Sequence, residues 1–364
     1  MTNRERSCEH IETKIVKAME RIESLFYETE GKCYLSFSGG KDSTVIIALI
    51  KMCEEIYTLP PNAIPAVFCK TGIELGATVD FVKWVSENYY GNVQMIQPEK
   101  TFSWIINNKG KPMKSKMKSE YIGRYQRKPD GTAKSFLIDR DNRYQKTRLA
   151  NKDMHMIHCN FDIKISNQCC KYLKKDPFNK YGEEQQMKGY MTGERVAEGG
   201  ARELNTKKRI DNGGSICTKT KGNMIVKLPI VDWTNEDIEE FIQKYDVPLS
   251  KAYTEQGYER TGCFLCPFSL QLDDNLKKLY EYEPNRYRAA LFWLKDVYIA
   301  QNVKLPFDEA YEAERRKKWQ ECYEKMRYEM LKEYRPEAAE KYNDIQMDIF
   351  DYLGGQNETK DETG

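Results

Sequence analysis

Six consecutive residues have the composition of a phosphate-binding loop. They read Ser-Gly-Gly-Lys-Asp-Ser and lie between an apolar run at 33–37 and a helical pattern at 44–53. The glycines allow a sharp turn, and the following helix N-terminus offers free N–H groups and a positive dipole end to an anion. A lysine charge, two hydroxyls and a carboxylate suited to Mg²⁺ complete the set. An ordinary Gly-Gly turn is the alternative. The candidate binding residues are Ser38, Gly39, Gly40, Lys41, Asp42 and Ser43, of which Lys41 and Asp42 are also candidate catalytic residues.

Four of the 11 cysteines form two close pairs that are far apart in the chain. Cys169 and Cys170 are adjacent, and Cys263 and Cys266 follow with two residues between them. Two pairs of thiolates bind Zn²⁺ tetrahedrally or hold a [4Fe–4S] cluster, and the spacing alone does not choose between them. A chain without any metal is the third possibility.

These groups must be positioned by alternating strands and helices. Strands are expected at 33–37, 64–69, 93–96, 187–191 and 224–228, and helices at 11–27, 44–53, 78–89 and 235–245. Such alternation is typical of βαβ units, so we expect an α/β fold with a doubly wound parallel sheet. We expect an α/β domain over 1–267, a helical C-terminal extension over 268–353 and a disordered acidic tail over 354–364.

The alternation dissolves at about 101–155, in a basic segment punctuated by Gly and Pro. Between Thr101 and Lys152 there are 14 Lys or Arg against 4 Asp or Glu, although the whole chain carries a net charge of only +2. This insertion is a candidate nucleic-acid interface. A solvated lysine-rich loop is the alternative.

No apolar run approaches the ~20 residues that a membrane span needs, and residues 1–6 lack the apolar core of a signal peptide. We therefore expect a cytoplasmic protein without a membrane partner. A reducing compartment favours a metal or cluster site over disulfides for the cysteines.

Five segments together resemble one known family. The loop resembles the PP-loop of ATP pyrophosphatases, and four later segments resemble sulfonucleotide reductases in the family's order. The chain is thus similar to PAPS reductase-like PP-loop proteins, and to the iron–sulfur branch that includes DNA-phosphorothioation and tRNA-thiolation enzymes. The four segments are Ala66–Glu74, Thr192–Arg195, Leu228–Ile238 and Gln256–Cys266.

The resemblance implies an adenine nucleotide α-hydrolase-like fold that binds ATP or another adenine nucleotide with Mg²⁺. It implies a [4Fe–4S] cluster on Cys169, Cys170, Cys263 and Cys266, and a catalytic role for Arg195 on phosphate or sulfate. It adds further nucleotide-binding candidates, namely Thr71, Gly72, Gly193, Arg195 and Arg202.

One departure bears on the reaction. The reductases carry a catalytic cysteine in a C-terminal Glu-Cys-Gly motif, whereas this chain has no cysteine after Cys322. We therefore favour ATP cleavage between the α and β phosphates, coupled to sulfur transfer. Nucleic acid is a candidate acceptor of the sulfur. A sulfonucleotide reductase and a non-catalytic nucleotide-sensing regulator are the alternatives. Partners implied by the resemblance are a sulfur donor and a thioredoxin-like or nuclease-like protein.

Overall fold

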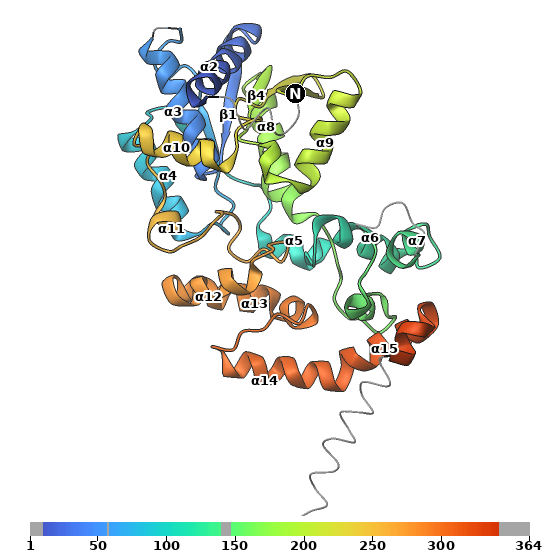
Figure 1. Ribbon diagram of the computed structural model, residues 1–364. Helices are drawn as coiled ribbons and strands as arrows, with labels where there is room; N and C mark the ends of the chain where they lie inside the picture. Colours follow the sequence, from blue (N-terminus) through green and yellow to red (C-terminus); the bar gives the residue numbers. More distant parts are fainter. Residues whose placement is uncertain (1–9, 57, 140–146, 342–364) are drawn as a thin grey trace, which may run out of the picture. The chain divides into compact units, whose positions relative to one another are not determined.

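The computed structural model describes residues 10–56, 58–139 and 147–341 (Figure 1). The chain divides into two compact units, the first formed by Met1–Phe102 with Cys170–Phe264 and the second by Ser103–Cys169 with Leu265–Gly364. Most of the basic segment thus belongs to the same unit as the C-terminal helices. The tail expected to be disordered, at 354–364, lies outside the described residues.

The first unit is built on a six-stranded sheet with the order β3-β2-β1-β4-β6-β5. All neighbouring strands are parallel except β5, which is antiparallel to β6. The expected doubly wound α/β fold is therefore confirmed, and β5 is an edge strand that the sequence patterns did not indicate. The strands are β1 (Cys33–Phe37), β2 (Ala66–Cys69), β3 (Val93–Ile96), β4 (Gly189–Met191), β5 (Thr218–Lys221) and β6 (Met224–Lys227).

Helices cover both faces of this sheet (Figure 1). One layer holds α2 (Ile11–Glu28), α3 (Lys41–Glu55), α4 (Gly76–Asn88) and α10 (Asn235–Lys244), whose apolar side chains share one core with the sheet. Thr234 caps α10 as expected, since its hydroxyl accepts a hydrogen bond from the N–H of Asp237. The other elements of the unit are η2 (Lys171–Lys175), α8 (Asp176–Glu184), η3 (Val196–Glu198), α9 (Gly200–Asp211) and α11 (Lys251–Thr254).

Strand alternation assigns side chains to the two faces. Leu35 and Phe37 enter the core shared with α2 and α3, whereas Tyr34 enters a smaller cluster with Tyr181 of α8. Burying a side chain of this size contributes roughly 1.5–3 kcal/mol. The end of β1 is therefore held from both faces, and the loop that follows it starts from a fixed point.

The second unit is helical in its described part. His155 is fully buried in it, its Nε2 lies 2.9 Å from the carbonyl oxygen of Ala300, and its ring packs against Trp319 and Tyr323. None of the helices in the described residues of either unit is long and apolar enough to cross a membrane. The helices of this unit are α5 (Phe102–Lys109), α6 (Lys116–Arg127), α7 (Ala133–Ile138), η1 (Asn151–Ile157), α12 (Leu272–Tyr282), α13 (Pro284–Ala300), α14 (Glu309–Lys318), η4 (Trp319–Tyr323) and α15 (Glu324–Tyr334).

The basic segment has more regular structure than its pattern indicated, because α5, α6 and α7 all lie in it. Some of its positive charge is also compensated within the unit. Lys111 pairs with Asp296 at 2.7 Å, and Lys114 pairs with the buried Asp153 at 2.8 Å. The nucleic-acid interface stays a prediction, and it would have to use the other basic side chains.

Candidate functional site

The order of the strands creates a crevice at the carboxyl end of β1. From β1 the chain crosses to β2 on one side, while β4 pairs with β1 on the other side. Ligands of open α/β sheets bind outside the carboxyl ends of the strands at such a switch point. Ser38–Ser43 follows β1 and Thr192–Arg195 follows β4, so two of the sequence motifs meet there.

The phosphate loop turns through Gly39 and enters α3 at Lys41. Gly39 has φ of +68°, and a Cβ atom at this position would lie 2.8 Å from Cγ2 of Thr78. A glycine is needed for both reasons. Among the described residues, the N–H groups of Asp42 and Ser43 have no acceptor, as expected in the first turn of a helix.

Gly193 approaches this helix end closely. A Cβ atom there would lie 3.0 Å from Cβ of Asp42 and 3.3 Å from the backbone nitrogen of Ser43. A larger residue would therefore cover a donor of the first turn. The Gly of the Thr-Gly-Glu-Arg motif keeps the positive end of α3 open to a ligand.

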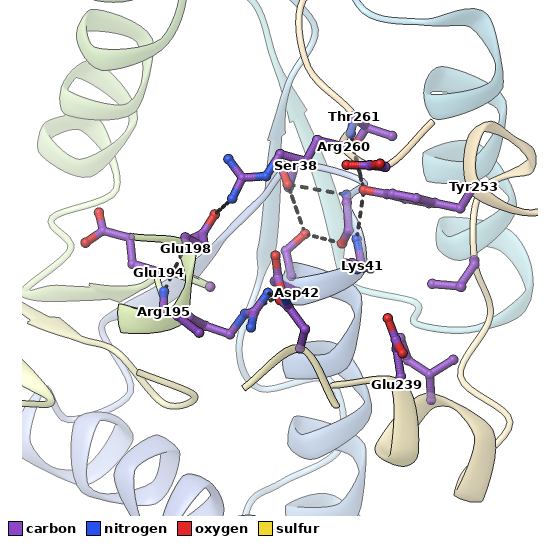
Figure 2. Close-up of a pocket in the computed structure, with 18 of the residues that line it drawn as sticks. Ser38, Lys41, Asp42, Glu194, Arg195, Glu198, Glu239, Tyr253, Arg260 and Thr261 are labelled. Carbon is purple, nitrogen blue, oxygen red and sulfur yellow. Dashed lines mark hydrogen bonds and ion pairs between the residues drawn. The ribbon is translucent and has the colours of Figure 1, made fainter. Parts of the chain in front are cut away.

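A hydroxyl network fixes the loop itself (Figure 2). Ser43 Oγ donates to the carbonyl oxygen of Gly40 at 2.9 Å and lies 3.1 Å from Ser38 Oγ. The hydroxyl oxygen of Tyr253 accepts from the backbone N–H groups of Lys41 and Thr261, both at 3.3 Å. The loop is thus braced from within and by the segment that leads to Cys263.

Arg195 is held inside the protein (Figure 2). Its side chain is 3% exposed, and its Nε donates to Oδ1 of Asp42 at 2.8 Å. The other guanidinium nitrogens donate to the carbonyl oxygen of Trp233 at 3.3 Å and to Oδ1 of Asn235 at 3.0 Å. This geometry makes Arg195 a brace for Asp42.

The carboxylate of Glu198 pairs with two further arginines close to Arg195. Its Oε1 accepts from Arg260 at 2.6 Å and also pairs with Arg202, while its Oε2 accepts from the backbone N–H of Arg195 at 3.2 Å. The carboxylate is 7% exposed, whereas the two guanidinium groups reach the solvent. Figure 2 shows Arg260 pointing toward Glu198 across the pocket.

These residues line a pocket of about 1070 Å³ in the first unit. Lys41 is one of its lining residues, and its ammonium group has no ion-pair partner among the residues that the structure describes. The predicted site residues that line it are Ser38, Gly40, Lys41, Asp42, Ser43, Gly193, Arg195 and Arg202.

Three nucleotide-binding candidates do not line this pocket: Gly39, which forms the turn of the loop, and Thr71 and Gly72. The backbone N–H groups of Thr71 and Gly72 donate to the carboxylate of Glu74 at 3.1 and 3.0 Å. Glu74 also forms a β-bridge with Cys263. The motif after β2 therefore supports the cysteine segment, and a nucleotide contact by Thr71 or Gly72 stays a prediction.

The four cysteines are divided between the units. Cys170 and Cys263 belong to the first and Cys169 and Cys266 to the second. Burial raises the pKa of the Cys263 thiol. No group of three or more His, Cys, Asp or Glu side chains within the described ranges is arranged to hold a metal ion.

Sequence reasoning missed Tyr253 and Glu198. Tyr253 precedes the Gln256–Cys266 motif by a few residues and follows no pattern of its own. Glu198 lies three residues after Arg195, a spacing at which a carboxylate caps the N-terminus of a helix. Because Arg195 and not Ser or Thr occupies the N-cap, the segment lacks the sequence signature of such a cap, and no signal pointed to Glu198 or to Tyr253.

The fold and the site define a class: an α/β protein with an open helix N-terminus and a lysine at the switch point of a parallel sheet. A family model narrows this class. The model of the phosphoadenosine phosphosulfate reductase domain matches residues 32–133 and 136–269, which is more than half of the chain. The protein therefore belongs to this family.

Individual relatives are distant. An uncharacterized protein of Methanocaldococcus jannaschii is 26% identical over 288 residues, and the match covers 75% of this chain but only 54% of that protein. Solved structures with a similar fold include a phosphoadenylyl-sulfate reductase of Candida auris in complex with phosphate. It has 14% identity and a TM-score of 0.39 and covers 68% of this chain and 87% of the other. An FMN adenylyltransferase of Candida glabrata has 14% identity and a TM-score of 0.36, over 68% and 62% of the two chains.

Proposed function

We propose that the protein binds an adenine nucleotide with its phosphates at the N-terminus of α3. The observation that carries this proposal is the open first turn, where the N–H groups of Asp42 and Ser43 lack acceptors among the described residues and Gly193 leaves them uncovered. A helix N-terminus with a nearby lysine favours phosphate oxygens. Membership of a family of nucleotide-sulfate reductase domains supports the choice of ligand.

The reaction that we propose is adenylation of an acceptor by ATP. An oxygen atom bonded to a carbon of the acceptor attacks the α phosphorus, a new oxygen–phosphorus bond forms, and the bond from the α phosphorus to the oxygen that bridges it to the β phosphorus breaks. Pyrophosphate leaves with the electron pair. The first-turn N–H groups and Lys41 stabilise the charge that develops on it. A sulfur nucleophile then attacks the carbon that carries this oxygen, a carbon–sulfur bond forms, and the carbon–oxygen bond breaks as AMP leaves with the oxygen and the electron pair.

The charges of the pocket support Mg²⁺ as part of the ligand. Five carboxylates and four cationic side chains line it, so ATP without a metal would meet no net positive charge. Mg²⁺ is commonly held by one or two carboxylates together with substrate phosphates. Oδ1 of Asp42 is bonded to Arg195, and its second oxygen, without a partner in the described part of the chain, is the candidate ligand. The carboxylates are Asp42, Glu194, Glu198, Glu239 and Glu259, and the cations are Lys41, Arg195, Arg202 and Arg260.

Pyrophosphate release tests this proposal. The purified protein should release pyrophosphate from MgATP when its acceptor is supplied, and Lys41→Ala should lose most of this activity. Lys83→Ala, at an exposed position on α4, is the control and should retain it. Sulfite release from a sulfonucleotide with a thiol would instead identify a reductase, the second candidate, which the family match favours. Tight binding without turnover would indicate a nucleotide sensor.

We also propose, from the sequence motif, that Cys169, Cys170, Cys263 and Cys266 bind a [4Fe–4S] cluster. The support is the order of the two thiol pairs in a chain that belongs to this family. The described side chains are not arranged as a metal site, so no step of the proposed reaction passes through a cluster. Iron and acid-labile sulfide analysis after anaerobic purification distinguishes a cluster from zinc.

A further inference from the structure

A cysteine, a histidine and a glutamate lie in a row in the second unit, and none of the three lines the nucleotide pocket. Cys159 Sγ lies 4.0 Å from Nδ1 of His158, and Nε2 of His158 lies 2.7 Å from Oε2 of Glu329. Glu329 thus contacts the ring nitrogen that does not face the thiol. The three groups follow one another in a line and do not surround a common point, as the ligands of a metal ion would.

Two packed elements hold this row in place. His158 directly follows η1, whose last five residues are buried, and Glu329 lies on α15 directly before two buried residues. Arg335, at the end of α15, donates to Oδ1 of Asn151 in η1 at 2.6 Å and so joins the two elements. The His158 side chain is 8% exposed. Its ring is therefore fixed in orientation before any ligand arrives.

The hydrogen bonds assign the two ring nitrogens of His158. The backbone N–H of Asn160 donates to Nδ1 at 3.1 Å, so Nδ1 is an acceptor and Nε2 carries the proton that points to Glu329. In this tautomer the imidazole presents a basic nitrogen to the thiol, and the carboxylate stabilises the imidazolium that forms when the proton arrives. A nucleophile, its base and an orienting carboxylate thus occur in the order that activates a cysteine.

The thiol of Cys159 is accessible and stands apart from other thiols. It is the one exposed thiol among the cysteines that the structure describes, none of which forms a disulfide. Its contacts within the described residues are with His158 and Asn160. A thiol that forms mixed disulfides often lies beside a second thiol that resolves them. A thiol that takes up a single sulfur atom needs no such neighbour.

We propose that Cys159 accepts the terminal sulfur of a persulfide donor, with His158 as the base and Glu329 as a positioning residue. The thiol proton passes to Nδ1 as the bond from Asn160 is released, and the thiolate attacks the terminal sulfur. A new S–S bond forms, the S–S bond of the donor breaks, and the donor thiol leaves with the electron pair and the proton. Cys159 is oxidised to a persulfide and the donor is reduced to a thiol, so the step needs no other oxidant.

This persulfide is the source of the sulfur nucleophile in the proposed reaction. Only this use of the persulfide rests on the proposed function. Its formation depends on the Cys159, His158 and Glu329 side chains of the second unit.

Glutathione persulfide is the probe, added to the full chain without oxygen. Iodoacetamide then caps thiols and persulfides, and peptide mass spectrometry distinguishes the two from a disulfide with glutathione. We expect persulfide to form on Cys159 at least about tenfold faster than on the half-buried Cys322, whose Sγ contacts the Met326 thioether and not a base. Equal rates at the two cysteines, or a glutathione disulfide as the main product on Cys159, would overturn the proposal.

Variants test the role of each partner. His158→Gly should slow the reaction by about tenfold or more, and added imidazole should restore it because imidazole replaces the missing base. Glu329→Ala should also slow it, whereas Glu329→Gln should not, because its amide oxygen still accepts from Nε2. Glu333→Ala, at an exposed position one turn further along α15, is the matched control and should react as the wild type does. Wild-type rates in His158→Gly and Glu329→Ala would contradict the proposal, as would a loss in His158→Gly that imidazole does not restore.

Pyrophosphate release by the wild-type protein separates this inference from the proposed function. A protein that forms the Cys159 persulfide but releases no pyrophosphate from MgATP would refute the proposed reaction and support the sulfur site. Pyrophosphate release by a protein whose Cys159 forms no persulfide would refute the sulfur site alone.

Discussion

Replacement of Arg195 tests whether this residue braces the site or acts on the ligand. The guanidinium is 3% exposed and bonds to Asp42, Trp233 and Asn235. Arg195→Met keeps much of the side-chain volume and removes all three contacts. It also leaves the Asp42 carboxylate without its partner.

The expected loss of stability follows from the burial of the Arg195–Asp42 ion pair. Removal of one partner of a buried ion pair costs about 3–5 kcal/mol, because the other charge stays buried and unpaired. The Asp42 side chain is 24% exposed, so water offsets part of this cost. We expect Arg195→Met to lower the free energy of unfolding by about 2–3 kcal/mol. In the Asp42→Asn background, Arg195→Met should lower the free energy of unfolding by a smaller amount, with a difference of about 1 kcal/mol or more from its effect in the wild type.

Urea unfolding measures this change, followed by tryptophan fluorescence and by circular dichroism. Coincident transitions by the two methods would justify a single free energy for a chain with two units. Arg202→Met is the control, since the Arg202 side chain is 46% exposed and its partner Glu198 keeps a second arginine, Arg260. It should change stability by less than about 0.5 kcal/mol. An unfolding free energy of Arg195→Met equal to that of the control would refute the bracing role.

Four further predictions concern the loop, the cysteines and the basic segment. Lys41→Ala should weaken ATP binding by about 10- to 100-fold in calorimetry, as expected for a charge-assisted contact, and an unchanged affinity would exclude its role. Gly39→Ala should lower the melting temperature more than Gly199→Ala, because both have positive φ but only Gly39 lacks space for a Cβ atom. Alanine at any one of the four paired cysteines should abolish bound iron if they form a cluster, and iron content unaffected by all four changes would show that other residues hold it. Nucleic-acid binding, if the basic segment provides it, should fall steeply with salt and be lost in Lys116→Glu/Arg127→Glu, whereas no retention at ~50 mM salt would contradict it.

Local patterns were sufficient for five of the six strands and for the loop. Apolar runs bounded by turns located β1 and β2, because buried parallel strands are continuous in hydrophobicity, whereas β3 is an edge strand without a fully buried residue. The edge strand β5 reads Thr-Lys-Thr-Lys, and half of its residues face solvent, so no apolar run revealed it. The helices of the basic segment were missed for a related reason: their buried residues, such as Ile122 and Tyr125, are few and separated by lysines and arginines.

The site was harder to predict because its motifs support one another. The Thr192–Arg195 motif was assigned to the ligand by resemblance, yet Arg195 bonds to Asp42 of the phosphate loop and to Trp233 and Asn235 of the Leu228–Ile238 motif. Such contacts join residues 38 to 153 positions apart, and no spacing in the sequence encodes them. Because Arg195 neutralises Asp42 from inside, and Glu198 already holds two arginines, Lys41 is left as the cation without a carboxylate partner among the described lining residues. A phosphate entering the pocket would therefore meet one uncompensated charge and the open end of α3, and these two features would determine where its oxygens bind.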